Sequence, residues 1–239
     1  MSAPGSLAPR SRLVFPLDYP TLAEARRGAL RVRESVGVLK VGLELFVREG
    51  PSAVGLGQEL GCDIFLDLKL HDIPATVRRA VGSAAALGVR YLTVHAGGGP
   101  HMLEEAAAAA VGTGVTLLGV TVLTSLDAED LRAVGVAAAP AEQTVRLAKL
   151  ARSAGIGGLV CSTAEVERLR SELGPDVVLV TPGIRPSGAK ADDQKRVGTP
   201  ASAIAAGSTL LVVGRPIRDA EDPAEAARAI VAEIADAAR

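Results

Sequence analysis

The sequence predicts a single α/β domain of the (β/α)8, or TIM-barrel, class, and three observations support this prediction. Short runs rich in leucine and β-branched residues alternate eight times with amphipathic stretches rich in alanine, glutamate and arginine, a pattern typical of βα units around a parallel sheet. The chain has 239 residues, close to the roughly 250 of a typical barrel. Polar residues also follow the predicted strands at their carboxyl ends, where barrel loops converge on one mouth.

The predicted strands and helices alternate from residue 13 to the end of the chain. The last helix should begin after Asp222, because Asp is a good N-cap residue and Pro223 suits the first helical turn. A doubly wound open sheet is the alternative at this point, since hydrophobic patterning does not show whether a sheet closes. The expected strands are 13–17, 38–42, 64–68, 91–95, 117–122, 158–161, 177–181 and 209–213, and the expected helices are 21–35, 51–60, 73–87, 100–111, 140–154, 163–173, 199–206 and 222–238.

Composition and terminal sequence limit the classes of protein to consider. Residues 1–11 contain no apolar run typical of a signal peptide, so we expect a flexible tail before a barrel domain at 12–239. No apolar stretch reaches the roughly 20 residues needed to cross a bilayer. The two cysteines lack CxxC spacing, which favours small core residues, a reducing compartment and hence the cytoplasm. A net charge of −1 and 2% aromatic residues make a nucleic-acid polymer an unexpected partner.

The predicted third strand carries a charged motif, Asp67-Leu-Lys69-Leu-His-Asp72. Side chains two residues apart on a strand share a face, so Asp67 and Lys69 should point together. A structural ion pair is the simplest interpretation of such a pair alone. Lys40 at the adjacent strand adds a second cation, and the charges would alternate Lys, Asp, Lys, Asp if Asp72 folds back or arrives from a partner subunit. Such an array favours ionised aspartates and protonated lysines. A lysine held as a proton donor beside a carboxylate suits protonation of a carbanion.

Two Gly-Arg-Pro-like segments follow the predicted seventh and eighth strands, Thr181-Pro-Gly-Ile-Arg185-Pro and Val213-Gly214-Arg215-Pro. The loops after these strands are the usual phosphate site of a barrel. Glycine permits close approach of the backbone, and arginine matches phosphate oxygens with its fork of donors. We therefore predict a phosphate-binding site here, with residues 186–198 as a lid. The three histidines are not spaced as metal ligands, so no metal site is predicted.

With these motifs, the chain resembles the bacterial orotidine 5′-monophosphate decarboxylase family over nearly its whole length. The motif DxKxxD alone is shared with sugar-phosphate decarboxylases of the same superfamily, whereas the full set is specific. The matching segments are Leu17-Asp18, 40–46, 65–76, Val94-His95-Ala96, 120–125, Val160-Cys-Ser162, 181–185, Asp193-Gln194-Lys195-Arg196 and 213–216.

The resemblance implies cofactor-free decarboxylation of orotidine 5′-monophosphate to uridine 5′-monophosphate in de novo pyrimidine biosynthesis. It implies that Lys69 protonates C6 of the pyrimidine, that Asp67 faces the substrate carboxylate, and that Lys40 holds Asp67 and the ribose in register. It also implies a homodimer in which Asp72 and Thr76 reach the neighbouring subunit's site. The remaining substrate-binding residues implied are Asp18 for the ribose, Thr124 and Ser125 for the pyrimidine, and Arg185, Gln194, Gly214 and Arg215 for the phosphate.

Two other functions stay open on the sequence alone. A metal-dependent sugar-phosphate decarboxylase of the same superfamily would share DxKxxD. A catalytically silent barrel that only binds nucleotides would share the fold, but it would not need Lys40, Asp67, Lys69 and Asp72 together.

Overall fold

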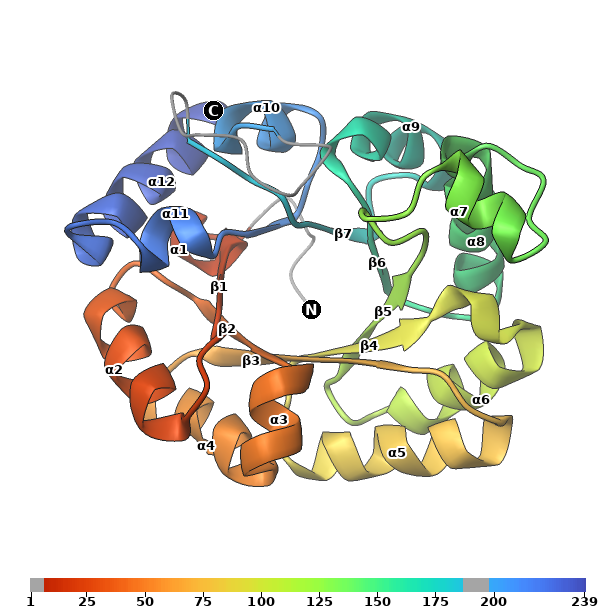
Figure 1. The fold of residues 1–239 in the computed structure, drawn as a ribbon, viewed down its shortest axis with the longest axis horizontal. Coiled ribbons are helices and arrows are strands. Elements are labelled where there is room, and N and C mark those ends of the chain that lie inside the picture. The colour runs from red at the N-terminus through yellow and green to blue at the C-terminus, as the bar shows by residue number, and fades with distance from the viewer. Residues whose placement is uncertain (1–6, 187–197) are drawn as a thin grey trace.

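The computed structural model describes residues 7–186 and 198–239 and has eight parallel strands in a closed barrel, ringed by helices (Figure 1). Strand β1 pairs with both β2 and β8, which closes the sheet and rules out the open, doubly wound alternative. The prediction of a (β/α)8 barrel is therefore confirmed. The strands are β1 (Leu13–Pro16), β2 (Val38–Gly42), β3 (Asp63–Leu70), β4 (Tyr91–His95), β5 (Thr116–Val120), β6 (Gly158–Val160), β7 (Val178–Thr181) and β8 (Leu210–Val212).

The predicted helices are all present, with ends that differ by no more than a few residues. Asp222 caps the last helix as expected, because its side chain accepts hydrogen bonds from the backbone N–H groups of Ala224 and Glu225. These helices are α2 (Leu22–Val32), α4 (Pro51–Leu60), α5 (Pro74–Ala86), α6 (Pro100–Ala110), α8 (Pro140–Ser153), α9 (Thr163–Leu173), α10 (Pro200–Ala205) and α12 (Pro223–Ala237).

In the described part of the chain, five short helical segments were not predicted. Each is at most seven residues long, too short for a helical hydrophobic period to emerge from the sequence. They are α1 (Pro9–Arg12), α3 (Leu43–Glu49), η2 (Ala96–Gly98), α7 (Ala128–Ala133) and α11 (Arg215–Arg218).

The N-terminal segment contacts the barrel before β1 begins. Residues 1–6 of the expected tail lie outside the described residues, and α1 occupies its end. The Arg12 side chain is buried and donates to the backbone carbonyls of Ser208 and Thr209, at 2.6 and 3.2 Å. Carbonyl oxygens thus satisfy a guanidinium whose burial is otherwise costly.

The apolar core has two parts, one between the strands and the helices and one inside the barrel. The inner cluster fills the barrel below its mouth and leaves the carboxyl ends of the strands free to form a site. None of the described helices is both long and apolar enough to cross a bilayer. The inner cluster consists of Val14, Val38, Phe65, Tyr91, Leu118, Val180 and Leu210.

Candidate active site

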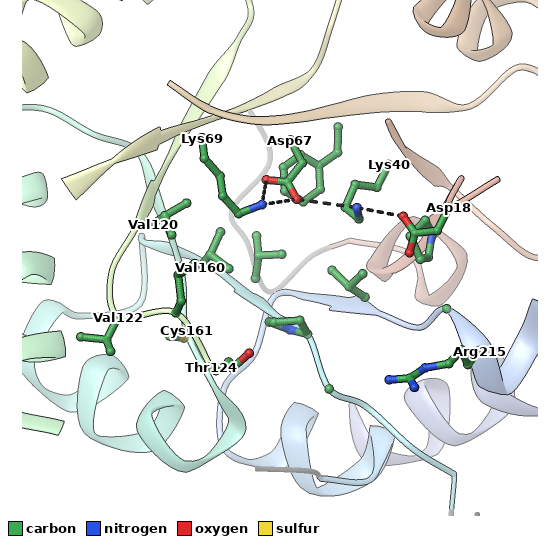
Figure 2. Close-up of a pocket in the computed structure, with 18 of the residues that line it drawn as sticks. Asp18, Lys40, Asp67, Lys69, Val120, Val122, Thr124, Val160, Cys161 and Arg215 are labelled. Carbon is green, nitrogen blue, oxygen red and sulfur yellow. Dashed lines mark hydrogen bonds and ion pairs between the residues drawn. The ribbon is translucent and has the colours of Figure 1, made fainter. Parts of the chain in front are cut away.

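A cavity of about 310 Å³ opens at the carboxyl ends of the strands, within the range typical of small-molecule sites. One wall is charged and carries Asp18, Lys40, Asp67 and Lys69 (Figure 2). The opposite wall is largely apolar, and Phe65 of the inner cluster lines the cavity from below. The apolar wall includes Val120, Val122, Leu123, Val160, Cys161, Val180 and Val212.

The four charged side chains form a continuous row of alternating sign. Lys69 Nζ lies 2.9 Å from both carboxylate oxygens of Asp67. Lys40 Nζ lies 3.6 Å from Asp67 Oδ2 and 3.5 Å from Asp18 Oδ1, so it bridges the two aspartates. Gly42 leaves room for this bridge, because a Cβ at this position would lie 3.1 Å from Lys40 Nζ. Lys40, Asp67 and Lys69 of the predicted array are thus brought together, but the second aspartate of the row is Asp18 and not Asp72, which does not line this cavity.

The environment of Asp67 favours its ionised form. Its side chain is only 14% exposed, and burial alone raises the pKa of a carboxyl group. The ammonium groups of Lys40 and Lys69, together with hydrogen bonds from Lys69 and Thr93, outweigh burial and hold the pKa of Asp67 below its ordinary value. The site therefore holds a carboxylate that faces the cavity.

The contact between Asp67 and Lys69 arises from a bulge as well as from strand alternation. Leu66 pairs with Leu92 and Leu70 with Val94, so three residues of β3 face the single residue Thr93 of β4. Lys69 has φ of 50°, the only positive φ of a non-glycine residue in the described part of the chain. The prediction of a regular strand at Asp67 to Lys69 is therefore wrong. β-bulges commonly redirect side chains next to active sites.

Arginines from two later loops, Arg185 and Arg215, line the cavity. Figure 2 shows Arg215 on the side of the cavity away from the Asp67–Lys69 pair. Arg185 follows β7, is 9% exposed, and donates a backbone hydrogen bond to the carbonyl of Gly198 at 2.9 Å. Arg215 follows β8 directly after Gly214, whose missing Cβ would lie 2.9 Å from Pro16 Cγ. Glycine therefore allows the start of this loop to lie close to the end of β1. Gln194 and most of the expected 186–198 lid lie outside the described residues.

Several predicted site residues are not brought into the cavity of their own chain. Thr124 lines it, whereas Ser125, Asp72 and Thr76 do not. Asp72 is exposed, and its carboxylate accepts a hydrogen bond of 2.6 Å from the backbone N–H of Ile73. Thr76 lies in the first turn of α5, outside the mouth.

Sequence reasoning missed two features of the site, Thr93 and the apolar wall. Thr93 is fully buried and contacts both Asp67 and the backbone of Lys69. No motif marks it, because an isolated threonine in a buried strand is common. Most of the apolar wall consists of valines from the fifth to eighth predicted strands. Alternation along a strand does not show which of its valines line the cavity at the barrel mouth.

His95, at the end of β4, lies beside the site but not in the cavity lining. Its ring stacks on that of His71, with centroids 5.3 Å apart. Burial, His71 and Lys69 lower the pKa of His95, which favours neutral imidazole. Among the described residues, no group of three or more His, Cys, Asp or Glu side chains is arranged to hold a metal ion.

The sequence is similar to those of known decarboxylases. The profile of the orotidine 5′-phosphate decarboxylase / HUMPS family matches residues 11–230. The orotidine 5′-phosphate decarboxylase of Anaeromyxobacter sp. strain K is 56% identical over 228 residues, which cover 95% of this chain and 100% of that protein. That of Halorhodospira halophila is 51% identical, with 99% and 100% covered.

The similarity extends to solved structures. The crystal structure of orotidine 5′-phosphate decarboxylase from Lactobacillus acidophilus superimposes with a TM-score of 0.82 at 36% sequence identity, covering 93% of this chain and 98% of that one. An uncharacterized conserved protein from Geobacillus kaustophilus gives 0.81 at 32% identity, with 93% and 99% covered. The chain belongs to the orotidine 5′-phosphate decarboxylase / HUMPS family.

Proposed function

We propose that this protein decarboxylates orotidine 5′-monophosphate to uridine 5′-monophosphate, a step of de novo pyrimidine biosynthesis, without a cofactor. The observation that carries the proposal is the alternating Asp18–Lys40–Asp67–Lys69 row on one wall of a cavity that also contains Arg185 and Arg215. The charged row can stabilise and protonate a carbanion that forms on the pyrimidine ring of the substrate. The arginines can bind its phosphate through charged hydrogen bonds. Two relatives that are 56% identical over 95% of this chain are named orotidine 5′-phosphate decarboxylases.

In this mechanism the bond between C6 and the carboxylate breaks, carbon dioxide leaves, and the electron pair stays on C6. Lys69 then transfers a proton from Nζ to C6. Asp67 would lie beside the departing carboxylate, where its like charge disfavours the bound substrate relative to the transition state. Its ionised form, favoured by Lys40 and Lys69, supports this role. The Val120 and Val160 side of the cavity offers an apolar environment for neutral carbon dioxide.

The phosphate end supplies binding energy rather than chemistry. A vinylic carbanion has no conventional electron sink, so the rate enhancement must lie near the upper end of the roughly 8–23 kcal/mol that enzymes supply. Contacts with a remote phosphate can be used to position the reacting ring. We assign this binding to Arg185, Arg215 and the backbone at Gly214, with Gln194 as a further ligand. Asp18 is assigned to the ribose, and Thr124 and Ser125 to the pyrimidine.

We propose that the active unit is a homodimer in which Asp72 and Thr76 complete the partner's site. The exposure of Asp72 and its position outside the cavity support this arrangement. Ile73 beside it is 66% exposed, and Leu43 and Val47 in the segment after the adjacent strand β2 are 51% and 81% exposed. Large exposed apolar side chains near one mouth are typical of interaction surfaces. A cytoplasmic location is also proposed, on the basis of two buried free thiols.

The second candidate is metal-dependent decarboxylation of a sugar phosphate. The matching family is described as orotidine 5′-phosphate decarboxylase / HUMPS, which does not by itself separate the two activities. The named relatives do not favour the second candidate, and Asp18 and Asp67, the carboxylates among the described cavity residues, are both paired with Lys40. The decisive experiment follows the loss of ultraviolet absorbance of orotidine 5′-monophosphate with purified protein and excess chelator. We expect turnover that does not depend on added metal. No turnover with or without metal would refute the proposed function, and turnover of a hexulose phosphate only with metal would establish the second.

A further inference from the structure

We propose that Thr93 is a positioning residue for the decarboxylation proposed above, and that its single hydroxyl holds both members of the Asp67–Lys69 pair. Thr93 Oγ1 donates to Asp67 Oδ1 at 3.0 Å and accepts from the backbone N–H of Lys69 at 2.8 Å. The side chain is 0% exposed and does not line the cavity. It therefore acts through Asp67 and Lys69 and not on the substrate.

The backbone of β3 explains why this hydroxyl is needed. At the bulge, three residues of β3 face Thr93 alone, so the regular backbone ladder is interrupted. The N–H of Lys69 donates to the Thr93 hydroxyl at 2.8 Å. A buried N–H group without an acceptor is costly. Thr93 thus provides an acceptor for the backbone N–H of Lys69, the single non-glycine residue with a positive φ, 50°, among the described residues.

The same hydroxyl also fixes the carboxylate. Lys69 Nζ contacts both oxygens of Asp67, and Lys40 lies 3.6 Å from Oδ2. The bond from Thr93 to Oδ1 determines the rotation of the carboxylate between these two flexible cations. Because both lysine side chains have several rotatable bonds, the rigid, buried β-branched side chain is the fixed point of the array. Loss of the Thr93 hydroxyl should therefore change both the orientation of the Asp67 carboxylate and the pKa of Asp67.

The test compares Thr93→Val, which keeps the shape but removes the hydroxyl, with Thr93→Ser, which keeps the hydroxyl. We expect Thr93→Val to lower kcat by about 10- to 100-fold, the effect typical of losing a hydrogen bond to a charged group. KM should change by less than about 3-fold, because the phosphate contacts lie elsewhere in the cavity. Thr93→Ser should keep kcat within about 3-fold of the wild type.

A pH profile separates positioning from a loss of packing. The Thr93 hydrogen bond helps to lower the pKa of Asp67, so the acidic limb of kcat should move to higher pH in Thr93→Val. Thr144→Val is the matched control, because Thr144 is also fully buried and its hydroxyl donates to a carboxylate, that of Glu165, at 3.5 Å outside the cavity. The control should keep the wild-type kcat and acidic limb. Thr93→Ala provides the same test if the valine variant does not fold.

Wild-type kcat and an unmoved acidic limb in a folded Thr93→Val or Thr93→Ala variant would overturn the proposal, even though the wild type decarboxylates the substrate. Absence of turnover in the wild type would instead refute the proposed function. In that case a crystal structure of Thr93→Val still tests the positioning role. We expect a rotated Asp67 carboxylate or a changed Lys69 φ, and an unchanged pair would overturn the inference.

Discussion

Replacing Lys69 with alanine should separate proton transfer from nucleotide binding. The change removes the amine that lies 2.9 Å from both oxygens of Asp67. It leaves Asp67 with Lys40 at 3.6 Å and the hydroxyl of Thr93 at 3.0 Å. The carboxylate thus keeps one cation and one neutral donor, while the proposed proton donor to C6 is lost.

The expected magnitude has two parts. A positioned general acid contributes about 10²- to 10⁴-fold to the rate. The ion pair adds electrostatic organisation: two unit charges 2.9 Å apart interact by roughly 6 kcal/mol at an effective dielectric of about 20, before the cost of desolvation is subtracted. The side chains of Lys69 and Asp67 are 30% and 14% exposed, so solvent reduces but does not abolish this interaction. We therefore expect kcat to fall by at least about 10³-fold.

Binding of uridine 5′-monophosphate should survive, because Arg185 and Arg215 belong to the loops after β7 and β8 and not to β3. Calorimetry should give a Kd within about 10-fold of the wild type, and single-turnover absorbance should give the chemical rate. Lys149→Ala is the matched control: it also removes an ion-paired lysine, 2.7 Å from Glu172, but outside the cavity. A Lys69→Ala variant with near-normal turnover would show that another group protonates C6.

Three further predictions concern the phosphate site, the dimer and the stability of the fold at acidic pH. Arg215→Ala should raise KM by at least about 10-fold with a smaller change in kcat, because a charged hydrogen bond to a remote phosphate is lost; an unchanged KM would remove Arg215 from the phosphate site. Mixing Lys69→Ala and Asp72→Ala subunits after mild dissociation should yield more activity than either parent, since one site of each heterodimer keeps both residues; no recovery would contradict the shared site. The folded pKa of Asp67 lies below its ordinary value, so its ionisation stabilises the fold above the unfolded pKa of about 4, and this contribution is lost as pH falls through the folded pKa. Urea unfolding should accordingly show the stability difference between wild type and Asp67→Asn shrinking from pH 7 to pH 3, and an equal difference at both would contradict it.

The fold could be predicted because its signals are local and repeated eight times. Each strand is a short apolar run, and helices such as α4 and α9 end where the pattern ends. Strands β3 and β5 depart most from the predicted ranges: β3 extends to Leu70 instead of ending at residue 68, and β5 ends at Val120 instead of residue 122. Helix α3 was missed because it follows β2 directly, and Gly42 is both the last residue of the strand and the N-cap of the helix. Closure of the sheet depends on the pairing of Leu13 and Val14 with β8, a contact between distant residues that no local pattern encodes.

The charged part of the site was predictable for a different reason. Lysine and aspartate at the ends of adjacent buried strands must lie close together in any parallel sheet, and burial forces them to pair. The bulge was not predictable, because nothing in the side chains of Asp67 to Lys69 disfavours a regular strand. It depends on how β3 meets β4, and its partner Thr93 lies 24 residues beyond Lys69. The role of Asp72 likewise depends on contacts that a single chain does not contain.

The position of the backbone strain indicates what the bulge is for. A left-handed residue with a side chain costs roughly 1–2 kcal/mol, and glycine would avoid most of this cost. At this position the chain instead has Lys69, whose amine contacts both oxygens of Asp67. Glycine would remove the strain and the proposed proton donor together. The buried hydroxyl of Thr93 offsets part of the cost by accepting the Lys69 N–H. Strain that stability alone would not retain is typical of functional sites, and here it coincides with the residue to which the chemistry is assigned.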